Sequence, residues 1–277
     1  MIRTNKLHSN NINGEMEKSM SMNMNASKRG EHENRTSRFI ELDIIRGCAI
    51  VSMIFLHFLW DLDYFGLVTL DENIYQFNKM ISTVFFLMVG ICLAITINKR
   101  QISSKQTAAR HLLFRGLWIF GIGMIITVIT LIFMPDRPIL FGVLHCIGFS
   151  IILSVPFLKF KSYNIVFAAV IILAGFIVGL YPVENPTIIH LAIGFHQSDI
   201  SRYTIDYFPL LPWFGISLLG VALGNWLYKD GKRQFLIPDI FEYKPVSIVS
   251  WLGKHSLLIY LLHQPVIAGV LGLFVIL

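Results

Sequence analysis

The sequence predicts an all-α protein, a polytopic bundle of about seven transmembrane helices. Three observations lead to this class. Hydrophobic residues make up 55% of the 277 residues and charged residues only 14%, against about a quarter in ordinary soluble domains. Apolar segments of spanning length recur along the chain, and lysine and arginine gather in alternate loops. No water-soluble fold of this size buries so much apolar surface, so lipid must cover part of it.

A transmembrane helix needs about 17–25 mostly apolar residues. Seven segments qualify, at about 39–60, 74–98, 110–133, 139–158, 163–182, 206–228 and 247–273. Only the turn 159–163 separates the fourth from the fifth, so one of these two is also compatible with a tilted or partly re-entrant segment. Residues 1–36 are rich in Asn, Ser, Met and charge without an apolar period. They predict a disordered tail before a membrane domain over 37–277.

The distribution of basic residues predicts the orientation in the membrane. Lysine and arginine concentrate in the tail and in the loops after the second, fourth and sixth segments. The loop 61–73 carries four acidic residues and no basic one. Cytoplasmic loops are the basic ones, so the N-terminus is expected in the cytoplasm and the C-terminus outside. The net charge of +6 therefore reflects orientation, and we expect no nucleic-acid partner.

The first predicted span carries four ionisable residues, Asp43, Arg46, His57 and Asp61. Such groups cost about 2.5–3.5 kcal/mol at the bilayer centre, which makes them candidates for function. At about 100° per residue all four lie on one stripe, which should face protein or water. Asp43 can pair with Arg46, and Asp61 can hold the tautomer of His57. The structural alternatives are interfacial anchoring for the first pair and helix packing for the second.

At this point the sequence resembles a known family. The run LDIIRGCAIVSMIFLHF is similar to the opening span of membrane acyltransferases. Together with FFLMVGICLAI, RPILFGVLHCIG, DYFPLLPWFGISLLG and WLGKHSLLIYLLHQP, roughly residues 38–270 resemble the heparan-alpha-glucosaminide N-acetyltransferase catalytic-domain family in its short prokaryotic form. The lysosomal members of that family are associated with a catalytic histidine in the loop before the second span. The segment 67–76 has none, so that role falls to His57.

The resemblance implies an integral membrane acetyltransferase in the plasma membrane of a prokaryote. An acetyl group would pass from cytoplasmic acetyl-CoA to an amine or hydroxyl of a sugar or glycan at the outer side. Membrane lipid, acetyl-CoA and the glycan acceptor are then the expected partners, and a homo-oligomer is left open. The rival interpretations are a transporter for a small solute or protons, since intramembrane His and Asp also serve proton relays, and a non-catalytic membrane scaffold.

The predicted topology sorts the remaining candidates by depth. His145 and His263 share the outer leaflet with His57 and Asp61 and are candidates for acid–base chemistry. A satisfied core histidine is the alternative for His145. No histidine pair has the i,i+3 or i,i+4 spacing of a helical metal site, so no metal is expected.

Two further groups of residues are candidates for binding. Asp206, Trp213 and Gln264 are the candidates for binding the sugar acceptor. Trp213 also fits an interfacial aromatic belt. Asp43, Arg46 and Arg115 are the candidates for the CoA side, because phosphates favour nearby guanidinium groups. Ordinary positive-inside anchoring is the alternative there.

Overall fold

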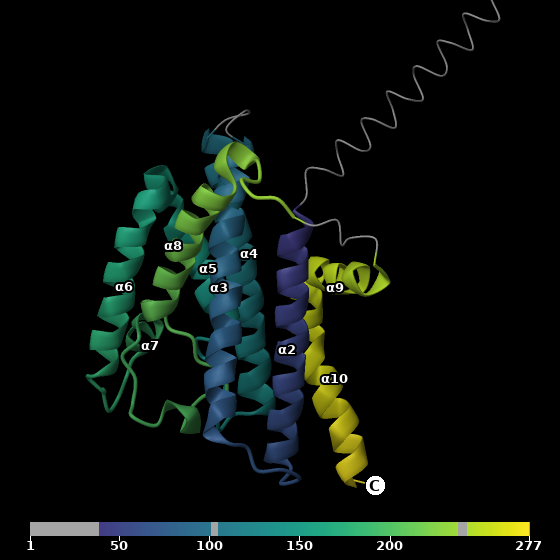
Figure 1. Cartoon of the computed structure of the whole chain (residues 1–277). Helices are drawn as coiled ribbons and strands as arrows, with labels where there is room; N and C mark the ends of the chain where they lie inside the picture. The colour runs from purple at the N-terminus through teal and green to yellow at the C-terminus, as the bar shows by residue number, and fades with distance from the viewer. Residues whose placement is uncertain (1–38, 101–104, 238–242, 277) are drawn as a thin grey trace, which may run out of the picture.

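The computed structural model describes residues 39–100, 105–237 and 243–276, which form an α-helical bundle (Figure 1). The predicted tail 1–36 lies outside these residues. The long helices are α2 (Ile40–Tyr64), α3 (Glu72–Arg100), α4 (Lys105–Phe133), α5 (Val143–Phe157), α6 (Asn164–Gly179), α8 (Leu210–Leu227) and α10 (Ser256–Ile276). The short elements are α7 (Ile188–Ile193), α9 (Lys244–Lys254) and the 3₁₀ segments η1 (Leu158–Tyr163), η2 (Ile200–Arg202) and η3 (Lys229–Gly231). The part of the chain described contains no β-strand, and the all-α polytopic class is confirmed.

The centre of the bundle is the contact between α3 and α8, which α6 extends on the other side of α8. Two glycines bring the backbones of α3 and α8 together. A Cβ atom on Gly90 would lie 1.9 Å from the carbonyl oxygen of Ser217, and one on Gly220 would lie 2.2 Å from that of Leu87. In lipid the hydrophobic effect does not drive helices together. Close backbone packing through small residues therefore has to stabilise the contact between α3 and α8.

Side chains on the outside of the bundle are large and apolar. Trp118 on α4 is 71% exposed and Phe176 on α6 is 68% exposed. Among the described residues, six helical stretches are long and apolar enough to cross a membrane. Outward-facing rings of this size are stable only in lipid, so the chain is an integral, multi-pass membrane protein.

The six stretches correspond to the seven predicted spans because one of them, Val143–Gly179, contains both α5 and α6. Lys161 in η1 has φ 48° and ψ −119°, which turns the backbone. The start of α5 meets the start of α8, where the Cys146 thiol contacts the Pro209 carbonyl oxygen. The end of α6 also meets the start of α8, where Gly175 lies against Pro212. Helices α5 and α6 therefore run antiparallel.

Each arm of this hairpin is short for a span. Helices α5 and α6 contain 15 and 16 residues, or about 22–24 Å at 1.5 Å per residue. The hydrocarbon core is about 30 Å thick. Seven crossings, and with them the N-in, C-out orientation, remain predictions.

The last predicted span, 247–273, is divided in the structure. Helix α9 ends at Lys254, His255 leaves the helical conformation (φ −101°, ψ 16°), and α10 begins at Ser256. Helix α9 lies crosswise to α2, while α10 runs along α2 and diverges from it toward the C-terminus (Figure 1). The apolar run alone predicted one continuous helix. The break places Lys254 and His255 at a corner instead of inside a span.

The number of crossings can be measured with reporters. A fusion after Leu277 and a tag inserted after Ser162 in η1 should report the outer side and the cytoplasm, respectively, because seven crossings put the chain ends on opposite sides. A signal from the outer side at the Ser162 tag, with the C-terminal fusion also outside, would instead mean five crossings, with the α5–α6 hairpin re-entrant. A cytoplasmic signal from the C-terminal fusion would contradict the predicted orientation.

Candidate active site

The last turns of α2 and the first half of α10 bring four predicted residues together. The imidazole rings of His57 and His263 meet edge to face, with centroids 4.6 Å apart and planes at 89°. One residue further along α10, the Gln264 side-chain amide donates to Asp61 Oδ1 at 2.9 Å. We call His57, Asp61, His263 and Gln264 the outer cluster, after the side of the membrane on which the predicted orientation places them. These contacts turn the His57–Asp61 part of the polar stripe toward α10, whereas the periodicity predicted only a stripe that faces protein or water.

The tautomers of the two histidines follow from their backbone partners. His57 Nδ1 lies 2.9 Å from the carbonyl oxygen of Met53, and His263 Nδ1 lies 2.5 Å from that of Tyr260. A carbonyl only accepts, so each Nδ1 carries the proton and each Nε2 is an acceptor. The prediction that Asp61 orients His57 is therefore wrong. Asp61 binds Gln264 across the helix interface, and the preceding turn of α2 orients His57.

The outer cluster contains buried acceptors that lack a donor. Asp61 Oδ2, Gln264 Oε1 and His263 Nε2 are buried and make no hydrogen bond to any part of the chain that the structure describes. A buried polar atom left unpaired costs about 1–3 kcal/mol. All three atoms accept hydrogen bonds, so a molecule rich in N–H or O–H groups is the natural partner of this site.

His145 has a different environment. Its Nδ1 accepts from the backbone N–H of Gly142 at 3.2 Å, and its Nε2 lies 3.2 Å from the hydroxyl of Thr127, which in turn donates to the Ile139 carbonyl. Both ring nitrogens are occupied, and the ring stacks on Phe141 at 5.7 Å. His145 fastens the start of α5 to α4. This geometry favours the satisfied core histidine over the catalytic one.

Asp206 also binds the start of α5. Its Oδ2 accepts from the backbone N–H of Val143 at 3.0 Å, where the positive end of the helix dipole favours a carboxylate. Burial nevertheless raises the pKa of Asp206 to about 6, and the Val143 hydrogen bond offsets part of that rise. The sequence analysis predicted that Asp206 binds the sugar acceptor. The structure shows a helix cap that faces a cavity.

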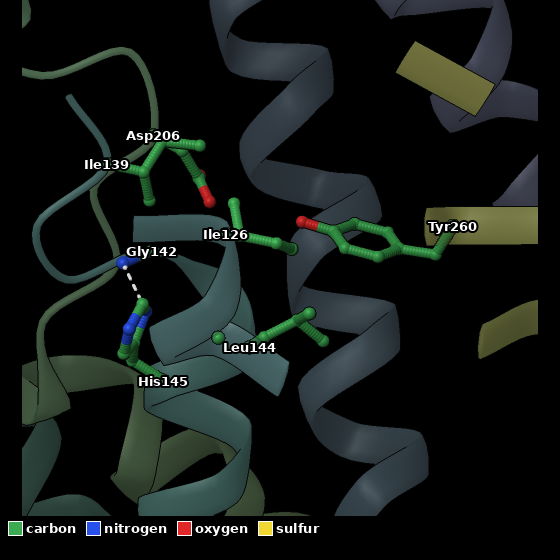
Figure 2. A pocket seen from close by; sticks show the side chains of 8 residues that line it. Ile126, Ile139, Gly142, Leu144, His145, Asp206 and Tyr260 are labelled. Carbon is green, nitrogen blue, oxygen red and sulfur yellow. Dashed lines mark hydrogen bonds between the residues drawn. The ribbon is translucent and has the colours of Figure 1, made fainter. Parts of the chain in front are cut away.

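That cavity lies between the start of α5 and α10 (Figure 2). It has a volume of about 20 Å³, and its polar lining comes from His145, Asp206 and Tyr260, so it has room for one water molecule. Tyr260 also lies beside the outer cluster, with its ring 5.5 Å from that of His263. Sequence analysis missed Tyr260, although its i,i+3 spacing to His263 puts both on one face of α10.

Trp213 is half-buried and packs against a cluster of aromatic side chains. Its ring is 5.0 Å from the rings of both Phe86 and Phe208, which joins α8 to α3. These contacts favour a packing role over the predicted wall for a sugar.

At the other end of α2 lies a cationic group. Arg46 donates to Asp43 Oδ1 at 3.1 Å and to the Cys92 sulfur on α3. Arg115 on α4 interacts electrostatically with both Arg46 and Cys92. Asp43 is only 2% exposed. Arg115 forms no ion pair with an acidic side chain in the described residues, so these three side chains combine two guanidinium groups with one carboxylate. Glu41, in the first turn of α2, pairs separately with Arg233.

Comparison with protein families gives one result that bears on these two clusters. A family model described as heparan-alpha-glucosaminide N-acetyltransferase, catalytic, matches residues 38–265. The match includes the polar stripe of α2, the outer cluster and the cationic group. Neither the curated proteins nor the solved structures give a significant match.

The environment of Asp206 predicts a pH dependence of stability. Its folded pKa lies above the ordinary value of 3.8, so the folded state favours the protonated carboxyl. The stabilisation is present below about pH 4 and is lost as the pH rises through about 6. Relative to Asp206→Asn, the wild type should therefore gain about 1–2 kcal/mol between pH 7 and pH 4, after allowance for partial exposure.

Thermal unfolding in detergent at several pH values measures this difference. Asp199→Asn, at an exposed carboxylate paired with Arg202, is the matched control and should run parallel to the wild type. Parallel profiles for Asp206→Asn as well would contradict the burial argument.

Proposed function

Because the chain belongs to the heparan-alpha-glucosaminide N-acetyltransferase catalytic family, we propose that it moves an acetyl group from cytoplasmic acetyl-CoA to an amine or hydroxyl of a sugar or glycan at the outer side of the membrane. Membership makes it a membrane acetyltransferase-type protein. The acceptor, the direction of transfer and the residues below are our proposal, as is the plasma membrane of a prokaryote as its location.

The observation that carries the proposal is the set of unpaired acceptors in the outer cluster. An amino or hydroxyl group brings the N–H or O–H donors that Asp61, Gln264 and His263 lack. The same donors are the protons that must leave when nitrogen or oxygen attacks a thioester. Binding and activation of the acceptor thus use the same lone pairs.

His57 is the proposed general base. Its Nδ1 is held by the Met53 carbonyl, which fixes the ring and leaves Nε2 free to accept a proton. The acceptor nitrogen or oxygen attacks the acetyl carbonyl carbon and loses its proton to Nε2. The carbon–sulfur bond then breaks, and the imidazolium returns the proton to the CoA thiolate. A transient acetyl group on His57 is the alternative route through the same nitrogen.

The cationic group at the opposite end of α2 is the proposed place for the CoA phosphates. Arg46 and Arg115 supply guanidinium groups, which bind phosphate oxygens well, and Asp43 orients Arg46. Eleven residues of helix separate Arg46 from His57, or about 16 Å. The flexible pantetheine arm of CoA suits that separation, since it carries the thioester away from the phosphates.

The rival function is a transporter that uses the same buried His and Asp side chains as a proton relay. Saturable acetyl-CoA binding by the purified protein supports acetyl transfer. Solute flux into liposomes without acetyl-CoA binding would support transport.

The general base is tested with His57→Asn, which removes Nε2 as a base and keeps a polar side chain. Acetyl transfer should fall by about 10²–10⁴-fold, the usual effect of losing a positioned base, while acetyl-CoA binding is retained. Asp61→Asn keeps an acceptor for Gln264 but removes the negative charge, so it should raise KM for the acceptor more than it lowers kcat. His111→Asn, on the exposed face of α4, is the control. Near-normal turnover of His57→Asn would assign the base elsewhere.

The CoA site is tested by direct binding of acetyl-CoA. Arg115→Ala should weaken affinity about tenfold or more, since a hydrogen bond to a charged group contributes about 1.5–3 kcal/mol. Removing Arg46 alone would leave Asp43 buried and charged, so the variant of choice combines Arg46→Gln with Asp43→Asn. Arg110→Ala removes an exposed cation that lies over the Phe114 ring and should bind normally. Unchanged affinity in both test variants would mean that the phosphates bind at another place.

A further inference from the structure

Helix α9 is attached to the bundle through one face. Val249, Ser250 and Gly253 lie on that face against α2. A Cβ atom on Gly253 would lie 1.8 Å from the carbonyl oxygen of Asp43, so the two backbones touch. The helix is therefore held firmly at the level of Asp43, crosswise to α2 (Figure 1).

The other face of α9 is exposed and combines apolar with basic side chains. Ile248 is 62% exposed and Trp251 is 55% exposed. Lys244, Lys254 and the adjoining His255 are exposed on the same side, and the imidazole of His255 lies 4.5 Å from the Trp251 ring. The helix sequence KPVSIVSWLGK contains no acidic residue. A face with aromatic, aliphatic and cationic groups but no anion is complementary to a negatively charged, partly apolar surface.

The depth of α9 agrees with such a surface. Helix α2 has 25 residues, or about 37 Å, which covers a hydrocarbon core of about 30 Å and part of each headgroup layer. Asp43 lies about 5 Å from the start of α2. A helix lying crosswise at that depth is level with the boundary between headgroups and acyl chains.

We propose that α9 is a docking surface for anionic phospholipid headgroups at this membrane boundary. Trp251 and Ile248 enter the upper acyl region, and Lys244 and Lys254 bind phosphate groups. The inference does not depend on acetyl transfer. Since α9 covers Asp43, which orients Arg46, lipid bound to α9 also braces the cationic group.

The first experiment locates Trp251 in nanodiscs that contain the full chain. Brominated phosphatidylcholine quenches tryptophan emission at a depth set by the bromine position. The Trp251 contribution is the difference between wild type and Trp251→Phe. Bromine near the headgroup should quench this difference more strongly than bromine deep in the acyl chain, and aqueous iodide should have little effect. Strong iodide quenching without bromine quenching would overturn the proposal and indicate that α9 faces water or a soluble partner.

The second experiment measures selectivity for charge. Nanodiscs of phosphatidylcholine alone are compared with nanodiscs that include phosphatidylglycerol, and the lipid retained by the purified protein is counted by native mass spectrometry. Each lysine near an anionic surface contributes about fivefold to affinity. The Lys244→Gln/Lys254→Gln variant should therefore lose most of the preference for phosphatidylglycerol.

The Lys229→Gln/Lys232→Gln variant is the matched control, because it removes two exposed lysines in and next to η3 and leaves α9 intact. It should keep the preference for the anionic lipid. An equal loss in both double variants would show that total charge, and not α9, selects the lipid, and the proposal would fail.

Discussion

Lipid does not solvate the polar stripe of α2, and this constraint determines what has to surround that helix. A charged or hydrogen-bonding side chain in a bilayer is stable only against protein or water. The stripe is satisfied at each end by a different set of neighbours. Cys92 of α3 and the crosswise helix α9 cover its first turns, and α10 covers its last turns through His263 and Gln264. The chain's last apolar run is divided into α9 and α10, so that one helix packs on the first turns of α2 and the other on its last turns.

The rest of the bundle supplies a rigid support. Helices α3 and α8 touch backbone to backbone at Gly90 and Gly220. The start of α5 is fixed twice, by His145 through Thr127 and by the carboxylate of Asp206. These polar groups resemble a catalytic set in the sequence because they lie at the same predicted depth. Their partners are backbone groups at a helix start, which have no other donor or acceptor available.

The sequence predicts the features that follow from a helix considered alone. The apolar runs define the spans, and a rotation of 100° per residue puts Asp43, Arg46, His57 and Asp61 on one stripe. The features that depend on a second helix were not accessible. Asp61 lies one turn from His57 but binds Gln264, because an interhelical amide competes for the carboxylate. The break at His255 and the packing of Trp213 against Phe86 likewise arise from contacts between distant segments.

Helix α2 is polar at both ends and apolar between them. Any group that moves along this helix therefore has to cross the apolar section uncharged, or at a cost in free energy. Ile50 is fully buried and Met53 is 5% exposed, and they occupy the interval between Arg46 and His57. A charged intermediate would cross this interval at a cost of several kcal/mol. A thioester is uncharged, and so is the acetyl group it carries. In the transfer that we propose, the acyl group therefore traverses the apolar section while the phosphates stay with the guanidinium groups. Charge separation is then confined to the outer cluster, where imidazole and carboxylate groups already lie together.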